Sequence, residues 1–579
     1  MKEMKNLRIQ IIFIISVFIL MSGLTSCESL IEEEKFDFIQ NTDIPNSDAG
    51  ADLWVTGVYG GLSSMFRYNM FPNVYDMDCD YMTGPDWAFS SFGAGNYQGS
   101  EHTQSMWEQL YNLIHRANFA LENIDKMSKL SIAHRANVTG ELNLIKGYAY
   151  FMLVRAYGEI PLWKNSVNSG IENVNQPRQS ISIVYEHIIQ LLTYAEENTY
   201  KNTNGSFEEG RVSAGVAAAF LSKVYMTIGS ASMASGIVNV KGGVPLETNS
   251  AGTKFYTAHT KLMLEKSLVK GYEEFDSKVY YKLAMDKAKQ VIEGEYGSYD
   301  LLPYSSLWTQ ESKNKIEHMW SLQTISGDAI YGPQYPKSYF GTYNSAGYVI
   351  SGKWYGMRDH WYKLFEENDL RIYEGVLHKW VTANQDTFNG GSAYPSFGVW
   401  NERVINKEAP YDDNRTYYST IGSSSYLAYL AKYSFVSDNG VDRQDANWSF
   451  MRFAEVILIY AEAANEFNDG PTQDALIAIN RVRERSEATP FTLSGNNSTG
   501  DLISFRSAII DERARELAAE GDRRWDLLRW GIYLEVMNSI GGFDEVGVNK
   551  IRAQRHLLYP IPNTEINSND AINTNNPGW

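Results

Sequence analysis

The stretch GELNLIKGYAYFMLVRAYGEIPL, from Gly140 to Leu162, decides the fold of this 579-residue chain. Its apolar residues recur at helical spacing, and Ala149, Leu153 and Ala156 among them follow the pattern A-x3-L-x2-A. Two small residues with a large apolar one between them let a helix lie close against its neighbour. Pro161, which cannot continue a helix, follows soon after. The stretch therefore predicts a tightly packed helix of the kind found in tetratricopeptide repeats.

The same spacing recurs on two later helices, once in full and once with valine in the last place: at Ala454, Leu458 and Ala461, and at Ala217, Leu221 and Val224. The intervals between the three occurrences are unequal, which excludes a regular solenoid. We therefore predict a mostly α fold. Tetratricopeptide-like helix pairs form its scaffold, an α-α superhelix, which is interrupted by a large, irregular, loop-rich insertion. The alternative is generic close packing of helices with no relation to that repeat.

Hydrophobic periodicity predicts where the scaffold helices lie. They are expected at about residues 52–62, 105–127, 132–157, 181–198, 212–229, 279–293, 449–468, 472–485 and 504–520. Residues 67–104 and 300–447 have little such periodicity, and we expect them to be irregular. Long irregular segments in compact proteins are usually functional. The tail from 557 to 579 is rich in Pro and Asn and is expected to be an extended strap packed on the helices.

The composition is that of a globular protein and excludes several functions. Charged residues are 21% and hydrophobic residues 44%, which argues against disorder. The net charge of −18 has the wrong sign for a protein that binds by neutralising phosphates, so nucleic acid is not an expected partner. Aromatic residues reach 13%, with 38 Tyr and 14 Trp, more than a helical core needs. Flat amphipathic rings of this kind suit surfaces that stack against ligands.

The N-terminus has the layout of a secretory signal peptide. Basic residues precede an apolar run from Ile11 to Met21, which is too short to span a bilayer. The residues Leu24-Thr25-Ser26-Cys27 that follow resemble the bacterial lipobox. This resemblance implies that residues 1–26 are removed and that Cys27 is acylated and anchors the chain to a membrane. An ordinary signal peptide with an incidental cysteine is the alternative.

An acidic run, Glu28 and Glu32 to Glu34, follows the lipobox directly. It resembles the signal with which Bacteroidota send lipoproteins to the cell surface, and a merely solvated linker is the alternative. Residues 27–50 are thus expected to form a lipid-anchored tether. Cys79 is then the only free thiol, which leaves no disulfide within the chain.

Four blocks of sequence together resemble the RagB/SusD family of surface lipoproteins. They are the stretch quoted above; PRQSISIVYEHII (Pro177–Ile189) with GRVSAGVAAAFLSKVYM (Gly210–Met226); RFAEVILIYAEAANE (Arg452–Glu466); and IIDERARELAAEGDRRWDLLRWG (Ile509–Gly531) with LLYPIPNTEINSNDAINTNNPGW (Leu557–Trp579). The resemblance implies a SusD-like fold in which residues 51–579 form one domain. Its parts are expected to be a scaffold at about 51–66, 105–293 and 449–556, a ligand-binding insertion at about 300–447, and the strap at 557–579. In the last block, Glu520, Arg523 and Arg524 are expected to join a charge network beside Trp525.

The resemblance also implies a function by binding. Family members typically capture an oligosaccharide or polysaccharide at the cell surface and close as a lid over a TonB-dependent outer-membrane barrel of the SusC type. We therefore expect a lipid-anchored glycan-binding protein of the outer membrane with a SusC-like partner and no catalytic residues. A peptide-binding uptake lipoprotein of the same fold is one alternative. A polysaccharide-degrading hydrolase or lyase is another, because 69 acidic residues leave a catalytic carboxylate pair open.

A glycan site needs flat rings for the apolar sugar faces and polar groups for the hydroxyls. Two irregular segments supply both. They give the candidate ligand-binding residues Tyr81, Asp86, Trp87, Asn96 and Tyr97 in the first, and Trp354, Tyr355, Trp400 and Arg415 in the second. The family has no shared motif at these positions, so none is carried over from it. Trp87 is the leading candidate because it lies mid-loop, and the alternative is a tryptophan folded into the core. Trp361, in the apolar pattern WYKLF, is expected to be buried.

No motif requires a cofactor, and calcium is the one alternative. Asp76, Asp78 and Asp80 alternate as at the start of a calcium-binding loop. However, Tyr81 stands where that loop needs glycine, and Trp87 where it needs a bidentate glutamate. The nine His show no HExxH spacing, and no G-x-S-x-G elbow is present. We therefore expect no bound cofactor and keep these three aspartates as candidate calcium ligands.

Overall fold

The computed structural model describes residues 44–66, 70–84, 89, 91–98, 100–167, 170, 174–242, 246–248, 254–256, 260–343, 349–350, 356–366, 368–377, 379–381, 392–393, 428–495, 498–544 and 547–579. Residues Ser47 to Trp579 form one compact unit. All structural statements below concern the described residues of this unit.

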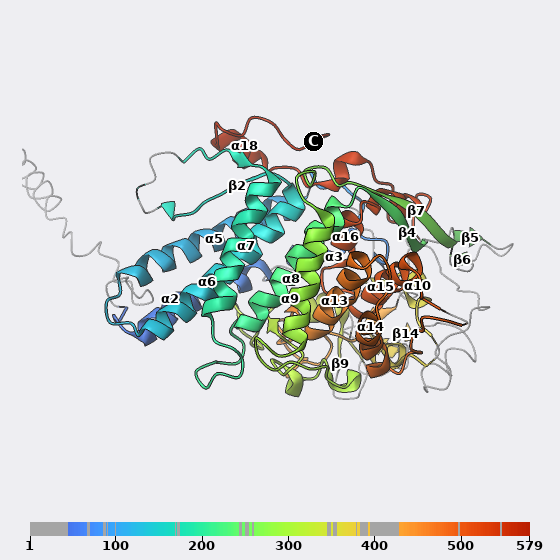
Figure 1. Ribbon diagram of the computed structural model, residues 1–579, viewed down its shortest axis with the longest axis horizontal. Helices are drawn as coiled ribbons and strands as arrows, with labels where there is room; N and C mark the ends of the chain where they lie inside the picture. The colour runs from blue at the N-terminus through green and yellow to red at the C-terminus, as the bar shows by residue number, and fades with distance from the viewer. Residues whose placement is uncertain are drawn as a thin grey trace, which may run out of the picture. The chain divides into compact units, whose positions relative to one another are not determined.

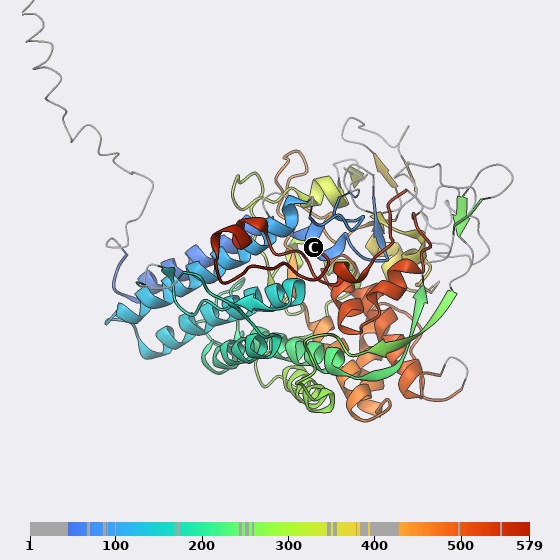
Figure 2. The same cartoon turned by 90° about the horizontal axis from the view of Figure 1, so that it is seen from above.

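A row of helices forms the first part of the unit, and each helix packs against the next (Figures 1 and 2). In chain order these helices are α2 (Asp48–Phe66), α5 (Glu101–Lys126), α6 (Ile132–Tyr157), α7 (Ile181–Asn198), α8 (Ala214–Ser232) and α9 (Ser277–Ile292). Helix α9 then packs on α13 (Phe453–Phe467), which also contacts α14 (Gln473–Arg485) and α15 (Leu502–Glu516). We call these nine helices the helical array. The mostly α fold class is therefore confirmed.

The helices begin at residues whose side chains accept a backbone hydrogen bond. Ser100, Ser131, Ser180 and Ser213 precede α5, α6, α7 and α8, and each hydroxyl oxygen accepts an N–H from the first turn. Helix α6 ends at Gly158, whose φ of 74° is a conformation that glycine adopts at low cost. These local signals explain why α6 and α7 begin and end at the predicted residues.

The repeated small-residue pattern lies at helix–helix contacts. All its members on α6, α8 and α13 are buried. Beside the pattern, Gly147 of α6 lies so close to α7 that an added Cβ would be 2.9 Å from a Cδ of Leu192. Helix α8 is the one helix of the described part that is long and apolar enough to cross a membrane, and it is wholly buried. It is therefore a core helix, held by close packing on both sides.

Short elements lie between and after the array helices. Two were missed in residues 67–104, where we expected an irregular segment: α3 (Met70–Asp76) and β1 (Met82–Thr83). That expectation is wrong in part, because elements of this length are too short to show periodicity. The helix expected from residue 449 begins only at Phe453, since β16 (Ser449–Met451) pairs with β8 (Trp320–Ser321) instead.

A long hairpin, also missed, consists of β4 (Ser235–Gly242) and β7 (Thr260–Ser267), with β5 (Leu246–Thr248) and β6 (Lys254–Tyr256) beyond them. Helices α16 (Arg523–Arg529) and α17 (Tyr533–Asn538) follow α15. Between α9 and α13 the described residues also form these short elements: η3 (Tyr304–Ser306), η4 (Gln310–Ser312), η5 (Pro336–Phe340), β9 (Thr342–Tyr343), β10 (Val349–Ile350), β11 (Gly356–Met357), α10 (Asp359–Tyr362), α11 (Leu370–Gly375), β12 (Val376–Leu377), β13 (Lys379–Val381), β14 (Ser392–Ala393) and β15 (Tyr429–Leu430). A four-stranded sheet has the order β14-β13-β10-β9, and β2 (Ile160–Pro161) pairs with β3 (Arg178–Gln179).

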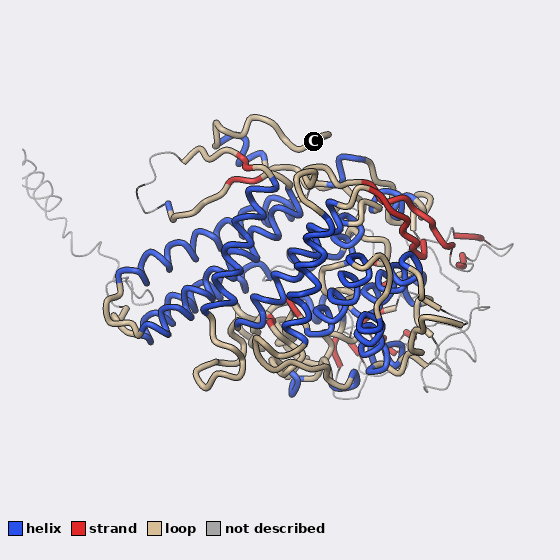
Figure 3. Tube along the Cα trace, in the orientation of Figure 1, coloured by secondary structure: helices blue, strands red, loops and turns tan. Residues whose placement is uncertain are grey.

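The C-terminal residues lie across the end of α6. The tail contains only η7 (Gln554–Leu557) and α18 (Asn563–Ser568) and otherwise runs as a loop (Figure 3). The N–H of Tyr559 donates to the carbonyl of Ala156 over 2.8 Å, and Nδ2 of Asn576 donates to the carbonyl of Tyr157 over 2.9 Å. The tail thereby satisfies carbonyl groups that the end of a helix leaves without partners.

Candidate ligand-binding site

Three chain segments meet at one small β junction. Strand β1 pairs antiparallel with β11, Met82 opposite Met357 and Thr83 opposite Gly356. On the other side of β11, Met357 and Ala428 exchange two backbone hydrogen bonds of 2.7 and 3.2 Å. The N–H of Arg358 also donates to the carbonyl of Tyr81 over 2.8 Å. We call residues 81–83, 356–358 and 428 the loop junction.

The loop junction brings together the ends of the segments that hold the predicted ligand-binding residues. Because β1 and β11 are antiparallel, the chain leaves β1 and enters β11 at the same end of the ladder. Trp87 follows β1 by four residues, and Tyr355 immediately precedes β11. Trp400 and Arg415 belong to the segment that ends at Ala428. The sequence indicated two separate segments, and the structure joins them at their bases.

Several predicted site residues lie outside the described residues, and their predictions stay as they are: Cys27, Asp86, Trp87, Trp354, Tyr355, Trp400 and Arg415. Asn96 is described and exposed, as a ligand-binding residue must be. Trp361 is buried, as predicted, and its indole N–H donates to the carbonyl of Ala514 over 2.9 Å.

Tyr81 and Tyr97 were expected to face a ligand, and the structure corrects both expectations. Tyr81 is 1% exposed, with the guanidinium carbon of Arg523 4.2 Å from its ring centre. Tyr97 is fully buried, and its hydroxyl lies 3.1 Å from Nη1 of Arg524. Its ring also packs at 4.9 Å from that of Tyr559 in the tail. Both rings thus cover buried arginines in the core.

The candidate calcium ligands are also corrected, because arginines engage two of the three carboxylates. Asp80 forms two hydrogen bonds of 2.9 and 2.8 Å with Arg523. Asp78 pairs with Arg524 and Arg552 at 2.5 and 2.8 Å. Burial alone would raise the pKa of Asp78, but the two guanidinium groups outweigh it and lower that pKa. Asp76 is the exception, since burial and the charge of Asp522 raise its pKa well above the usual value.

These aspartates do not converge on one cation. Among the described residues, no group of three or more His, Cys, Asp or Glu side chains is arranged to hold a metal ion. Two of the three alternating aspartates instead tie the segment before β1 to Arg523, Arg524 and Arg552.

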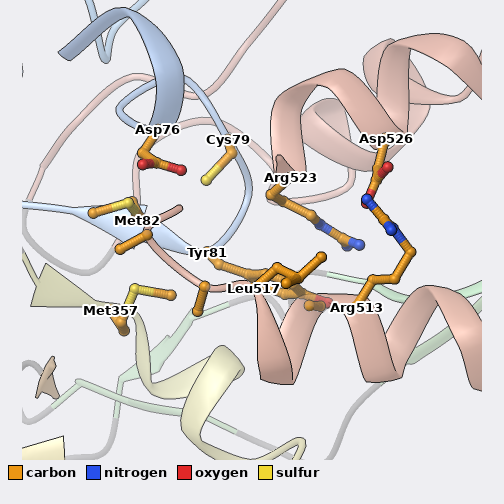
Figure 4. A pocket seen from close by; sticks show the side chains of 12 residues that line it. Asp76, Cys79, Tyr81, Met82, Met357, Arg513, Leu517, Arg523 and Asp526 are labelled. Carbon is orange, nitrogen blue, oxygen red and sulfur yellow. The ribbon is translucent and has the colours of Figure 1, made fainter. Parts of the chain in front are cut away.

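Two further basic side chains donate hydrogen bonds to backbone carbonyls in and just before β1. Nζ of Lys550 donates to the carbonyl of Met82 over 2.7 Å, and Nη1 of Arg358 donates to that of Asp80 over 2.7 Å. Figure 4 shows the space behind β1, with Cys79, Met82, Met357 and Arg523 around it. This cavity measures about 10 Å³, roughly the space of one water molecule. It is too small for a sugar, so we assign it to the foundation of the site.

The insertion is held on α15 by a buried network of ion pairs, which we call the charged base. At its centre, Glu516 accepts hydrogen bonds from Arg371, Arg452 and Arg485 over 3.1, 2.9 and 2.6 Å. Arg371 belongs to α11 of the insertion and also pairs with Glu512 at 2.7 Å. Burial alone would raise the pKa of Glu516, but the surrounding guanidinium groups hold it well below the usual range.

The three residues predicted to share a network in the last sequence block are all paired, but in separate sets. Glu520 pairs with Arg452 at 2.6 Å and also with Lys432 in the charged base, whereas Arg523 and Arg524 pair with Asp80 and Asp78 before β1. Sequence reasoning missed Arg358, Lys550 and Arg552. The sequence shows only that these basic residues lie outside any periodic pattern. Such a position does not indicate which acceptor group each residue will bind.

The loop junction and the charged base are thus held by backbone pairing and by buried ion pairs. The fold defines a class: a helical scaffold protein in which segments distant in sequence meet at one small β junction.

Comparison with known proteins identifies the family. The family model described as "SusD family" matches residues 298–579, and the one described as "Starch-binding associating with outer membrane" matches residues 35–226. SusD-like protein P2 of Formosa agariphila is 23% identical, with 98% of this chain and 99% of that protein covered. The chain therefore belongs to the RagB/SusD family.

Solved structures share the fold. A SusD homolog from Bacteroides thetaiotaomicron matches with a TM-score of 0.70 and 22% identity, covering 93% of this chain and 98% of the other. Surface glycan-binding protein A from Bacteroides fluxus has a TM-score of 0.64 and 17% identity, with 91% and 99% covered. A laminarin-binding SusD-like protein has a TM-score of 0.63 and 19% identity, again with 91% and 99% covered.

Proposed function

We propose that this chain is a cell-surface lipoprotein that captures an oligosaccharide or polysaccharide and passes it to a SusC-like TonB-dependent barrel in the outer membrane. The observation that carries the proposal is the loop junction. It places the bases of the three segments with Trp87, Trp354, Tyr355, Trp400 and Arg415 side by side. Rings from these segments would then serve one ligand rather than three.

Two kinds of similarity support a sugar as that ligand. One family model carries starch binding and the outer membrane in its description, and two proteins of the same fold are named for binding glycan and laminarin. Sugar rings have apolar faces that stack on indole and phenol rings, while their hydroxyls need side chains such as Asn96 and Arg415. The high aromatic content of the chain agrees with this chemistry.

The binding step is tested by affinity electrophoresis of the chain through gels that contain one polysaccharide each. We expect at least one polysaccharide to retard the wild type, and Trp87→Ala or Trp354→Ala to abolish the retardation. Tyr194→Ala is the matched control, because this tyrosine is 38% exposed on α7 in the helical array and should leave retardation unchanged. Full retardation of both tryptophan variants would refute the proposed site.

The other functions make different predictions in the same experiment. If the chain binds peptides, no polysaccharide will retard it, whereas a peptide library will give saturable binding. If it is a hydrolase or lyase, incubation with the retarding polysaccharide will release new chain ends over time. A pure binding protein returns the polysaccharide unchanged.

Anchoring and transfer are tested separately in cells. We expect the wild type in the outer-membrane fraction and accessible to protease on intact cells, while Cys27→Ala is released from the membrane. Crosslinking on intact cells should capture the wild type together with a large β-barrel protein. Recovery of Cys27→Ala in the membrane would contradict acylation at this residue.

A further inference from the structure

The hairpin of β4 and β7 has one covered edge and one open edge. Its two strands pair over eight residues in a continuous antiparallel register, from Ser235 opposite Ser267 to Gly242 opposite Thr260. Side chains cover the outer edge of β4. An arginine of α15, Arg506, donates to the carbonyl of Ile237, and His360 donates to that of Lys241 over 3.1 Å.

These two contacts reveal which groups of β7 point outward. In an antiparallel ladder, alternate residues direct both their N–H and C=O groups to the partner strand, and the residues between them direct both away. The carbonyls of Ile237 and Lys241 point away from β7. The residues opposite them, Glu265 and Lys261, together with Met263 between, therefore direct their N–H and C=O groups away from β4.

This outer edge of β7 is open over the same three residues. In the described part of the chain the hairpin is a two-stranded sheet, and no other backbone group pairs with Lys261, Met263 or Glu265. All three residues are exposed, Met263 at 73%. An open strand edge is a template for a further strand, and proteins usually cover it.

The sequence of the edge is complementary to itself. If two copies of β7 run antiparallel with Met263 opposite Met263, Lys261 of each copy lies opposite Glu265 of the other. Opposite charges directly across a pair of strands stabilise the pairing, whereas like charges oppose it. Within the described part of the chain, Glu265 forms no ion pair and Lys261 has no carboxylate in ion-pair contact, although its charge helps to lower the pKa of the exposed Asp501.

We propose that the open edge of β7 binds β7 of a second copy of this chain, giving a two-fold dimer joined by a four-stranded sheet. Three facing residue pairs would exchange about six backbone hydrogen bonds. An interface in which the same patch serves both copies is the usual form of a homodimer. Three residues a side bury little area, so the dimer is weak in dilute solution and favoured where copies are concentrated on one membrane.

Charge reversal tests the pairing in the unit from Ser47 to Trp579, which is compact by itself. We expect sedimentation velocity to show a reversible dimer as the protein concentration rises toward about 1 mM. Lys261→Glu and Glu265→Lys each place like charges opposite one another at both ends, and should weaken the dimer about 10-fold or more. The double variant Lys261→Glu/Glu265→Lys restores opposite charges and should restore the wild-type dissociation constant.

A crosslink tests the register. Burial raises the pKa of the Cys79 thiol to about 12, so Met263→Cys supplies the only reactive thiol of the unit. A short bifunctional thiol reagent should join Met263→Cys into covalent dimers, because residue 263 faces its own copy. Ile477→Cys, 57% exposed on α14, is the control and should stay monomeric.

Two results would overturn the proposal. One is a chain that stays monomeric at every concentration and gives no crosslink through residue 263. The other is a dimer that neither single charge variant weakens, or that the double variant does not restore, since its interface would then lie elsewhere. Neither result bears on glycan binding, which the tryptophan variants test.

Discussion

The helical array and the charged base are both buried, yet different interactions hold them together. In the array, small and large apolar side chains pack closely, as Leu153 does between α6 and its neighbours. In the charged base, Arg452 and Glu516 are at most 1% exposed and depend on one another for their hydrogen bonds. Buried ion networks add little net stability, but losing one member leaves a charge without its partner. The insertion is thus fixed by residues that cannot be replaced one at a time.

Removal of Arg452 should give the largest effect. Its guanidinium pairs with Glu317, Glu516 and Glu520 at 2.7, 2.9 and 2.6 Å, so Arg452→Ala leaves three buried carboxylates short of a partner. We expect the free energy of unfolding in urea to fall by about 3–5 kcal/mol. A decrease in the free energy of unfolding of less than about 1 kcal/mol, as for an exposed ion pair, would show that water enters the charged base.

A cavity in the array should cost somewhat less. Leu153→Ala removes a fully buried side chain without exposing any charge. We expect urea unfolding to report a loss of about 3 kcal/mol. A loss well under 1 kcal/mol would mean that α6 and its neighbours close the space, against the tight packing inferred here.

The pH dependence of stability separates the two regions further. Glu512 and Glu516 have pKa values lowered in the folded state, so their contribution is present above the ordinary glutamate pKa and is lost as the pH falls below it. Below about pH 4.5, each such proton steepens the decline by up to about 1.4 kcal/mol per pH unit. Urea unfolding at several pH values should show a shallower decline for Glu516→Gln, whereas Leu153→Ala should run parallel to the wild type. Parallel curves for all three proteins would contradict the role of Glu516.

The smallest effect is expected at an exposed ion pair on α9. Lys282 pairs with Asp286 at 2.5 Å, but its side chain is 53% exposed. Lys282→Ala should lower the free energy of unfolding by less than about 1 kcal/mol. This variant is the control for Arg452→Ala, because both remove one cation from an ion pair and only burial differs.

Helices with long periodicity could be predicted from the sequence, and short elements could not. For α6 and α7, uninterrupted apolar spacing predicted both ends, and the structure shows that a serine caps the first turn of each. Strand β16 falls in the range predicted as helix because Phe450 and Met451 are apolar and lie close before α13, while its partner β8 lies more than a hundred positions earlier. Only the distant pairing decides between the two readings.

Two of the candidate ligand-binding residues were wrong. They were chosen because they lie in segments without periodicity, but exposure of a ring in such a segment depends on what packs over it. Tyr81 and Tyr97 are covered by Arg523 and Arg524, more than 400 positions away. The aspartates resembled a calcium loop because three carboxylates at alternate positions look alike whether a cation or arginines satisfy them.

Direct packing of α9 on α13 has a consequence for how the protein can change. The 293–452 segment begins and ends at two helices that contact each other, so it is an insertion whose two ends lie close together. The entropy of closing an excursion grows only slowly with its length, by about 0.6 kcal/mol for each doubling. The scaffold can therefore accept excursions of other lengths and other sequences, provided that the arginines meeting α15 are kept. The 293–452 segment can therefore be replaced while the helical array is kept, and a new binding specificity can arise without a change in the scaffold.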